Sequence, residues 1–386
     1  HQGLKDAAFL PEKLVTKFWQ IGPPKKFGRE YRDELAKANN VTVILNANAS
    51  NIQIDKQGGH VTRVDLKTLT GKVGQVHAKK FVLCCGCIEN ARLLLVSNSI
   101  TPDGLGNDGD LVGRFFMEHP TIRCGIVASD DDYDLADRYN RNFLNGVQYW
   151  PGIVAADLLQ EEKIILHCCA TVDVKADEED GTKVAQEIWH DYKTYGRLSD
   201  ELLDKVWQVA KDLDHVAYNI YRRFVLGKGV ISPIKYLFLT AHSEQAPNPD
   251  SRVLLSEERD ALGIRKIQLK WQLTELDKFT IRKLTEAIGL EFGRQNVGRV
   301  RIEEWLLASD NTWPDELVGQ FHHMGTTRMA DDPREGVVDK NCTVHGIRNL
   351  FIAGSSVFPT SGYVNPTLTI VALTLRLAEH LKTQFA

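Results

Sequence analysis

The sequence has no apolar run long enough to cross a membrane. A transmembrane helix needs roughly 20 consecutive apolar residues, and the longest candidate, Asn365 to Leu377, is interrupted by Pro, Thr and Arg. Neither sign of charge is in large excess, since 47 Lys and Arg face 51 Asp and Glu, a net charge of −4. Such a balance creates no strong field for polyanions. We therefore expect neither a membrane span nor a nucleic acid partner.

The cysteines also lack the paired spacing of a four-cysteine metal site. The seven cysteines are an odd number, and Cys84 and Cys87 stand in a CxxC arrangement without a second such pair. A disulfide framework and a zinc site are disfavoured, so we expect buried, reduced thiols. The acidic run Asp130-Asp131-Asp132 has no accompanying His, although Asp134 and Asp137 follow it. We interpret it as a solvated loop and expect no metal site.

The start of the chain shows no secretion signal. No charged and then apolar leader follows His1, so we expect a soluble cytoplasmic protein, with export left open because the first residue is not Met. At about 150 residues per domain, 386 residues predict two or three domain-sized units. An apolar content of 43% and a charged content of 25% are ordinary for a soluble globular protein.

The order of the expected elements divides the chain in two. Residues 25–38 have helical periodicity, 41–45 and 46–54 read as strands, 61–69 and 72–78 as a hairpin, and 80–86 as a strand that ends at Gly86 before a helix over 89–97. A strand, a glycine and a helix in this order are typical of a nucleotide-facing layer. Another strand over 350–353 and a helix over 366–382 end the chain.

The middle of the chain has a different texture. Strands over 122–127, 164–174 and 236–243 and helices over 183–194, 199–211 and 275–297 are separated by long insertions, which favours an α+β arrangement. We predict a cofactor domain from residues 31–110 and 321–386, and a substrate domain from residues 1–30 and 111–320. The aromatic residues of the middle helices are predicted to be core: Trp189, Tyr192, Tyr195, Trp207 and Tyr218.

One glycine pattern invites a dinucleotide interpretation that its context contradicts. Residues 104–109, Gly-Leu-Gly-Asn-Asp-Gly, match GxGxxG. That fingerprint needs a strand directly before it and a helix directly after it. Here a helix ends near Ser97 and Pro102 follows. We predict a loop, and no complete N-terminal βαβ unit is visible in the sequence.

Three ordered blocks carry a family resemblance. They are residues 82–97, with Gly86 and Asn90-Ala91-Arg92; residues 244–253, Glu-Gln-Ala-Pro-Asn-Pro-Asp-Ser-Arg-Val, with Asp260 and Gly263; and residues 322–381. The last block holds His-His-Met-Gly-Thr-Thr-Arg-Met from His322 and Asn-Pro-Thr-Leu-Thr from Asn365. Together they resemble the C-terminal two-thirds of the glucose-methanol-choline (GMC) family of FAD-dependent alcohol oxidoreductases, nearest its pyranose oxidase and bacterial sugar dehydrogenase side.

The resemblance implies a fold and a catalytic pair. The expected fold class is an α/β FAD-binding domain, with an incomplete Rossmann-like part, and an inserted α+β substrate domain. His322 corresponds to the family's active-site base, with His323 as the alternative, and His suits this role because its pKa lies near neutrality. Asn365 corresponds to its partner and can donate to the substrate oxygen; it also fits a helix N-cap position. For His119 in Glu118-His119-Pro120, a structural role is favoured.

The resemblance also implies the cofactor contacts. FAD would pass Ala353 and Gly354 along its ribityl chain, and Cys85 and Gly86 near its pyrophosphate. The backbone of Ala49 would meet adenine. The helix N-terminus at Pro366 and Thr367 would face the pyrimidine end of the flavin together with Asn365. For each of these residues, simple packing stays the alternative.

The implied activity is hydride transfer from a CH–OH group of a sugar or related alcohol to FAD, with oxygen or another acceptor reoxidising the flavin. Two alternatives stay open. The chain is one subunit of a split flavoenzyme whose partner chain supplies the absent N-terminal FAD segment, or it is a non-catalytic binding homologue.

Overall fold

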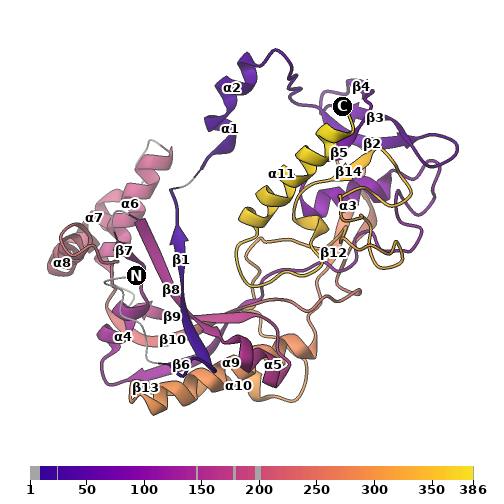
Figure 1. Ribbon diagram of the computed structural model, residues 1–386. Coiled ribbons are helices and arrows are strands. Elements are labelled where there is room, and N and C mark those ends of the chain that lie inside the picture. Colours follow the sequence, from indigo (N-terminus) through magenta and orange to yellow (C-terminus); the bar gives the residue numbers. More distant parts are fainter. Residues whose placement is uncertain (1–8, 24, 145–146, 177–179, 196–200, 386) are drawn as a thin grey trace. The chain divides into compact units, whose positions relative to one another are not determined.

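The computed structural model describes residues 9–23, 25–144, 147–176, 180–195 and 201–385, and these residues form two compact units. Unit 1 contains residues 1–24, 121–243 and 278–318, and unit 2 contains residues 25–120, 244–277 and 319–386. Residues 244–277 therefore pack in unit 2, whereas the sequence led us to expect them in the substrate domain. Figure 1 shows the elements of both units.

Unit 1 is built on one antiparallel sheet of seven strands. Its order is β1-β8-β9-β10-β6-β13, and β7 pairs with β8. The strands are β1 (Leu14–Ile21), β6 (Thr121–Ser129), β7 (Asn142–Leu144), β8 (Val147–Ala155), β9 (Cys168–Ala176), β10 (Ile234–Ser243) and β13 (Gly298–Ile302). The buried residues of these strands alternate with more exposed ones, and they share one core with Ile281, Leu284 and Ile288 of helix α9 (Glu275–Arg294). A sheet packed on one face by helices is the expected α+β arrangement.

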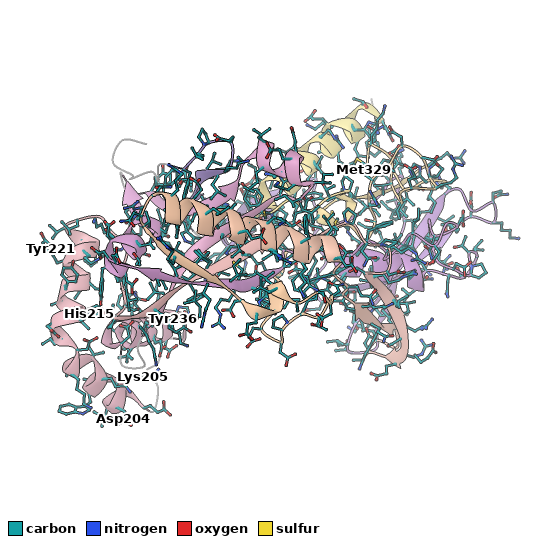
Figure 2. All side chains as sticks on the ribbon, turned by 90° about the horizontal axis from the view of Figure 1, so that it is seen from below. Asp204, Lys205, His215, Tyr221, Tyr236 and Met329 are labelled. Atoms are coloured by element: carbon teal, nitrogen blue, oxygen red, sulfur yellow. The ribbon has the colours of Figure 1, made fainter. Side chains whose placement is uncertain are left out.

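The remaining helices of unit 1 are α4 (Asp132–Tyr139), α5 (Asp157–Lys163), α6 (Gly181–Tyr195), α7 (Leu202–Lys211), α8 (Leu213–Phe224) and α10 (Glu304–Leu307). Figure 2 labels Asp204 and Lys205 on α7 and His215 on α8. Lys205 Nζ lies 3.5 Å from Glu187 Oε2, an ion pair that links α7 to α6. Residues 199 and 200 of the expected helix lie outside the described residues.

The prediction that the aromatic residues of these helices form core is wrong. Trp189 and Trp207 are 65% and 64% exposed, and Tyr192 and Tyr218 are also exposed. The side chain of Tyr195 is outside the described part of the chain. Helices α6, α7 and α8, which carry these residues, are amphipathic, but they pack mainly on one another and not on the sheet. The periodicity of these segments predicted correctly that they are helical, but it predicted incorrectly that their aromatic side chains are buried.

Unit 2 combines several small layers. Its elements are α1 (Phe27–Glu30), α2 (Arg32–Lys37), β2 (Asn48–Ile54), β3 (Val61–Lys67), β4 (Val73–Val76), β5 (Phe81–Leu83), α3 (Cys87–Val96), β11 (Arg252–Arg259), β12 (Arg265–Lys270), β14 (Leu350–Ile352), the 3₁₀ turn η1 (Ser355–Val357) and α11 (Thr367–Thr383). Strands β5 and β14 are parallel, β2-β3-β4 form an antiparallel sheet, and β11-β12 form a hairpin. The apolar side of α11 packs on the same core as β5 and β14, beside which it runs in Figure 1.

One buried asparagine joins two of these layers. Asn349 precedes β14 and is 1% exposed. Its Oδ1 accepts from the backbone N–H of Val61 at 2.7 Å, and its Nδ2 donates to the carbonyls of Val61 and Lys79 at 2.9 and 3.3 Å. The side-chain amide of Asn349 thus provides hydrogen-bond partners for the backbone of Val61 and Lys79, next to the parallel strands β5 and β14.

The elements near the start of the chain differ from the expected ones. The helix predicted over 25–38 is two short helices, α1 and α2, without buried residues. The strand predicted over 41–45 is not formed, and Val43, Ile44 and Leu45 are exposed. A β-branched run becomes a strand only where a neighbouring strand pairs with it, and none does so here within the described residues. The glycine pattern at 104–109 lies in turns, as predicted.

The expected fold class is confirmed: an α/β part with a short parallel sheet is interrupted by an α+β domain. The expected burial of the cysteines is confirmed for five of the seven and is wrong for two of them, since Cys84 and Cys85 are exposed. Across the described residues, the helices are either too short or too polar to cross a bilayer.

Candidate active site

The segment that carries His322 is held between two other parts of unit 2. Met117 and Met324 exchange backbone hydrogen bonds of 2.9 and 3.0 Å in an antiparallel bridge. On the other side, Thr327 and Met329 donate to the carbonyls of Ser356 and Val357. Three motifs that are far apart in the sequence are therefore adjacent in the fold.

Gly325 is required for this close packing. Its φ is +91°, and a Cβ at this position would lie 2.2 Å from the carbonyl oxygen of Phe115. Both the backbone conformation and the space exclude a side chain. The glycine of the His322 motif therefore brings the loop against residues 115–117.

His322 and Asn365 face one another. Asn365 Nδ2 lies 3.2 Å from His322 Nε2, and because an amide nitrogen can only donate, the imidazole nitrogen accepts. The pKa of His322 is lowered from its ordinary value by burial and, less, by the neighbouring His323. A neutral imidazole with a lone pair beside an amide donor can accept a proton from a hydroxyl group bound between them.

The alternative base, His323, is directed elsewhere. Its ring packs against Phe116, with centroids 5.5 Å apart, and its carbonyl accepts from Ser355 Oγ at 2.6 Å. The N-cap alternative for Asn365 is also not observed. Helix α11 begins at Thr367 after Pro366 without a side-chain cap, and the Asn365 amide contacts His322 instead.

His119, for which the sequence favoured a structural role, and its neighbour Glu118 lie against His322. His119 is fully buried, and its Nδ1 is 3.0 Å from His322 Nδ1. Glu118 is 3% exposed and accepts from the backbone N–H groups of Gln320, Phe321 and His322. Burial raises the pKa of Glu118 to about 7 against these hydrogen bonds. Sequence reasoning missed both contacts, and the adjacency of Glu118 and His119 was the only available signal.

The predicted glycine contacts lie at the carboxyl ends of the two parallel strands. Gly86 follows β5 with φ +84°, and Gly354 follows β14 with φ +117°. At both positions the space that a Cβ would occupy is open within 4 Å. The carboxyl ends of adjacent parallel strands are where α/β folds bind nucleotides, and these backbones are free for a close approach.

A buried asparagine holds these two turns together. Asn90 of α3 is 0% exposed. Its Oδ1 accepts from the N–H of Cys85 at 2.9 Å, and its Nδ2 donates to the carbonyl of Ala353 at 3.4 Å and to Ser356 Oγ at 3.0 Å. Asn90 therefore fixes Cys85 and Ala353 relative to one another.

A cavity of about 370 Å³ lies beside the first turn. Both Ala49 and Cys85 line it, with Asn48, Glu89 and Arg92 among the polar residues. This volume is within the range of small-molecule sites. The structure thus brings two of the predicted contacts, one from β2 and one after β5, to a single cavity.

Comparisons with known proteins show a family and several relatives to which this chain is similar. Residues 247–374 match the family model described as GMC oxidoreductase. The fructose dehydrogenase large subunit of Gluconobacter japonicus is 27% identical over 79% of this chain and 47% of its own length. The paromamine 6'-oxidase of Streptomyces fradiae is 26% identical over 89% of this chain and 53% of its own length. The chain spans about half the length of these curated relatives.

A solved structure extends the likeness to the fold. The FAD-dependent oxidoreductase from Chaetomium thermophilum superposes with a TM-score of 0.51 at 15% identity, covering 93% of this chain and 64% of that one. The family match covers the segment that contains both His322 and Asn365. Residues 247–374 match the GMC oxidoreductase family, and the relatives are similar to most of the chain.

Proposed function

We propose that this chain is the larger part of an FAD-dependent enzyme that oxidises a CH–OH group of a sugar or related alcohol. The observation that carries the proposal is the 3.2 Å contact between His322 Nε2 and Asn365 Nδ2. Alcohol oxidation requires a base and a hydrogen-bond donor at the substrate oxygen, and this contact supports those roles for His322 and Asn365. An intact pair of this kind argues against a non-catalytic homologue.

The residues present fit a bound flavin nucleotide. Gly86 and Gly354 leave backbone open at the ends of β5 and β14, and Ala49 and Cys85 line a cavity beside them. Asn365 and Thr367 are exposed at the start of α11, where helix amides carry partial positive charge. FAD bound along these positions would supply the hydride acceptor.

The chain's own residues would manage the proton. His322 Nε2 takes the hydroxyl proton of the substrate, and its lowered pKa keeps it neutral and ready at pH 7. Asn365 donates to the substrate oxygen and orients it without adding a competing base. Hydride loss from the carbon then follows the developing negative charge on that oxygen.

Sugars are the proposed substrate class, and oxygen or another acceptor would take the electrons. Relatives named for fructose dehydrogenation and paromamine oxidation support this choice. A cytoplasmic location stays a prediction. The test is anaerobic addition of a panel of sugars and simple alcohols to the flavin-containing protein, with flavin absorbance as the readout. Bleaching by a sugar supports the proposal, and a spectrum unchanged by every compound contradicts it.

The split-enzyme alternative has an observation of its own. Phe81 N–H and Leu83 C=O bond toward β14, so the peptide groups of Val82 point to the opposite edge of β5. In the described residues β5 pairs with β14 alone, and Val82 is 39% exposed. This unpaired edge of β5, beside the turn at Gly86 that we propose binds the nucleotide, could pair with an additional strand. A flavin spectrum of the chain with and without a co-purifying polypeptide distinguishes this case.

A further inference from the structure

His119 contacts polar groups on both sides of its ring, away from water. The side chain is 0% exposed. Its Nε2 lies 3.4 Å from the carbonyl oxygen of Ser361, and its Nδ1 lies 3.0 Å from His322 Nδ1. The two rings meet edge to face, with centroids 5.0 Å apart. A buried imidazole with two such neighbours has a defined proton arrangement.

The Ser361 carbonyl decides where the proton of His119 lies. A carbonyl oxygen can only accept, so His119 Nε2 carries the hydrogen and donates to it. In the neutral ring, Nδ1 of His119 is then the acceptor. The hydrogen between the two rings must therefore belong to His322 Nδ1.

The tautomer of His322 also determines the state of its Nε2, the nitrogen that faces Asn365. If His322 carries its hydrogen on Nδ1, its Nε2 has the lone pair, which agrees with the amide of Asn365 donating to it at 3.2 Å. One chain of hydrogen bonds thus runs from Asn365 through His322 and His119 to Ser361. Each donor in it meets an acceptor.

We propose that His119 is a positioning residue that holds His322 in the Nδ1–H tautomer and so keeps its Nε2 free to accept the substrate proton. The inference rests on the proposed function of His322. Neutral imidazole in water prefers the hydrogen on Nε2, the tautomer that cannot act as a base from that atom. His119 reverses the preference because it offers a buried acceptor to Nδ1 alone. Its ring is fully buried, and it acts through His322.

The backbone packing explains why His119 can do this. The Met117–Met324 bridge aligns residues 117–119 with residues 322–324. Glu118, between them, accepts from the N–H groups of residues 320–322 and so fixes the loop that carries His322. Ser361, whose carbonyl accepts from His119, is itself held in place. Its Oγ accepts from the backbone N–H of Gln245 at 3.1 Å. Both partners of His119 are thus anchored by the main chain.

The test is nitrogen-15 NMR of the purified full chain labelled at histidine, with His322 signals assigned by their loss in His322→Ala. The expected result is a neutral His322 with a protonated Nδ1 and an unprotonated Nε2. Protonated Nε2 in the unaltered protein overturns the proposal, and it does so whatever the enzyme's turnover, so this failure is distinct from failure of the proposed function.

Two variants extend the test. His119→Ala removes the acceptor, and His322 is expected to move to the Nε2–H tautomer. In His119→Asn the side-chain oxygen replaces Nδ1, so the Nδ1–H tautomer should return. Alcohol turnover at saturating substrate should fall about 10- to 100-fold in His119→Ala, as when an orienting partner of a functional His is lost, and recover to within about threefold in His119→Asn.

The control is His77→Ala, which removes an exposed histidine of the same unit. It should leave the His322 signals and turnover unchanged. If His119→Ala fails to fold, His119→Asn and the unaltered protein still decide the matter. An Nε2–H signal for His322 in His119→Asn, with the protein folded by circular dichroism, contradicts the assigned role.

Discussion

At the scale of single residues, Glu118 is a carboxylate whose environment opposes its charge. Burial raises its pKa to about 7 from the ordinary 4.5. The folded protein therefore binds this proton more tightly than the unfolded chain, so the stabilising contribution is complete below about pH 4.5 and is lost as pH rises through 7. The protonated form is the one that the fold prefers.

We predict that Glu118→Gln removes this pH dependence. The unaltered protein loses stability at Glu118 as pH rises, and the variant does not. The difference in free energy of unfolding, variant minus unaltered protein, should therefore be roughly 1–3 kcal/mol larger at pH 8 than at pH 5. Melting temperatures of both proteins at the two pH values measure it, and their difference cancels other titrating groups. A difference that is the same at pH 5 and pH 8 would mean that Glu118 does not titrate as described.

His322 predicts a pH profile of turnover. Burial, with a smaller effect of His323, lowers its pKa below the ordinary 6.5. The neutral imidazole is the active form, so kcat/KM should rise with pH through an apparent pKa below 6.5 and be level near neutrality. The profile is measured with the sugar that bleaches the flavin fastest. An ascending limb centred above 6.5 would contradict the assignment.

At the scale of elements, Asn90 connects the turn after β5 with the turn after β14. We predict that Asn90→Ala destabilises the protein by roughly 1–3 kcal/mol, because the N–H of Cys85 and the buried carbonyl of Ala353 lose their partner. Urea unfolding measures the change. Flavin affinity should fall as well, since both turns are proposed cofactor contacts. A loss below about 0.5 kcal/mol with unaltered flavin content would show that the turns do not depend on Asn90.

The open edge of β5 supports a second prediction at this scale. Val82→Pro removes an N–H that faces away from β14, so the bonds between β5 and β14 are kept and the chain should stay folded. The same change blocks addition of another strand at that edge, so flavin retention by the completed protein should be lost. Val82→Thr keeps the N–H and serves as the control. Normal flavin content in folded Val82→Pro protein would exclude strand addition at β5.

Local patterns predicted most elements, and long-range contacts decided the rest. The strand, Gly86 and helix order around β5 and α3 and the long helices α9 and α11 follow from periodicity within each segment. The strand expected at 41–45 failed because no described strand pairs with it. The partner of His119 lies 203 residues further along the chain, so no local pattern could indicate it.

At the scale of the whole molecule, the match of residues 247–374 to the GMC oxidoreductase family supports the proposed flavoenzyme, and the proposed activity rests on the His322 and Asn365 pair. The chain spans about half the length of the curated relatives that it matches. Experiments on activity therefore use the protein in the form that retains flavin, with any partner polypeptide that this requires.

The most direct test is the anaerobic rate at which substrate bleaches the bound flavin in the unaltered protein, in His322→Ala and in the control His77→Ala. Removal of a general base costs about 10²- to 10⁴-fold in rate. We predict a bleaching rate at least about 100-fold lower in His322→Ala and an unchanged rate in His77→Ala. A His322→Ala protein that bleaches as fast as the unaltered one would contradict the role of His322 as the base.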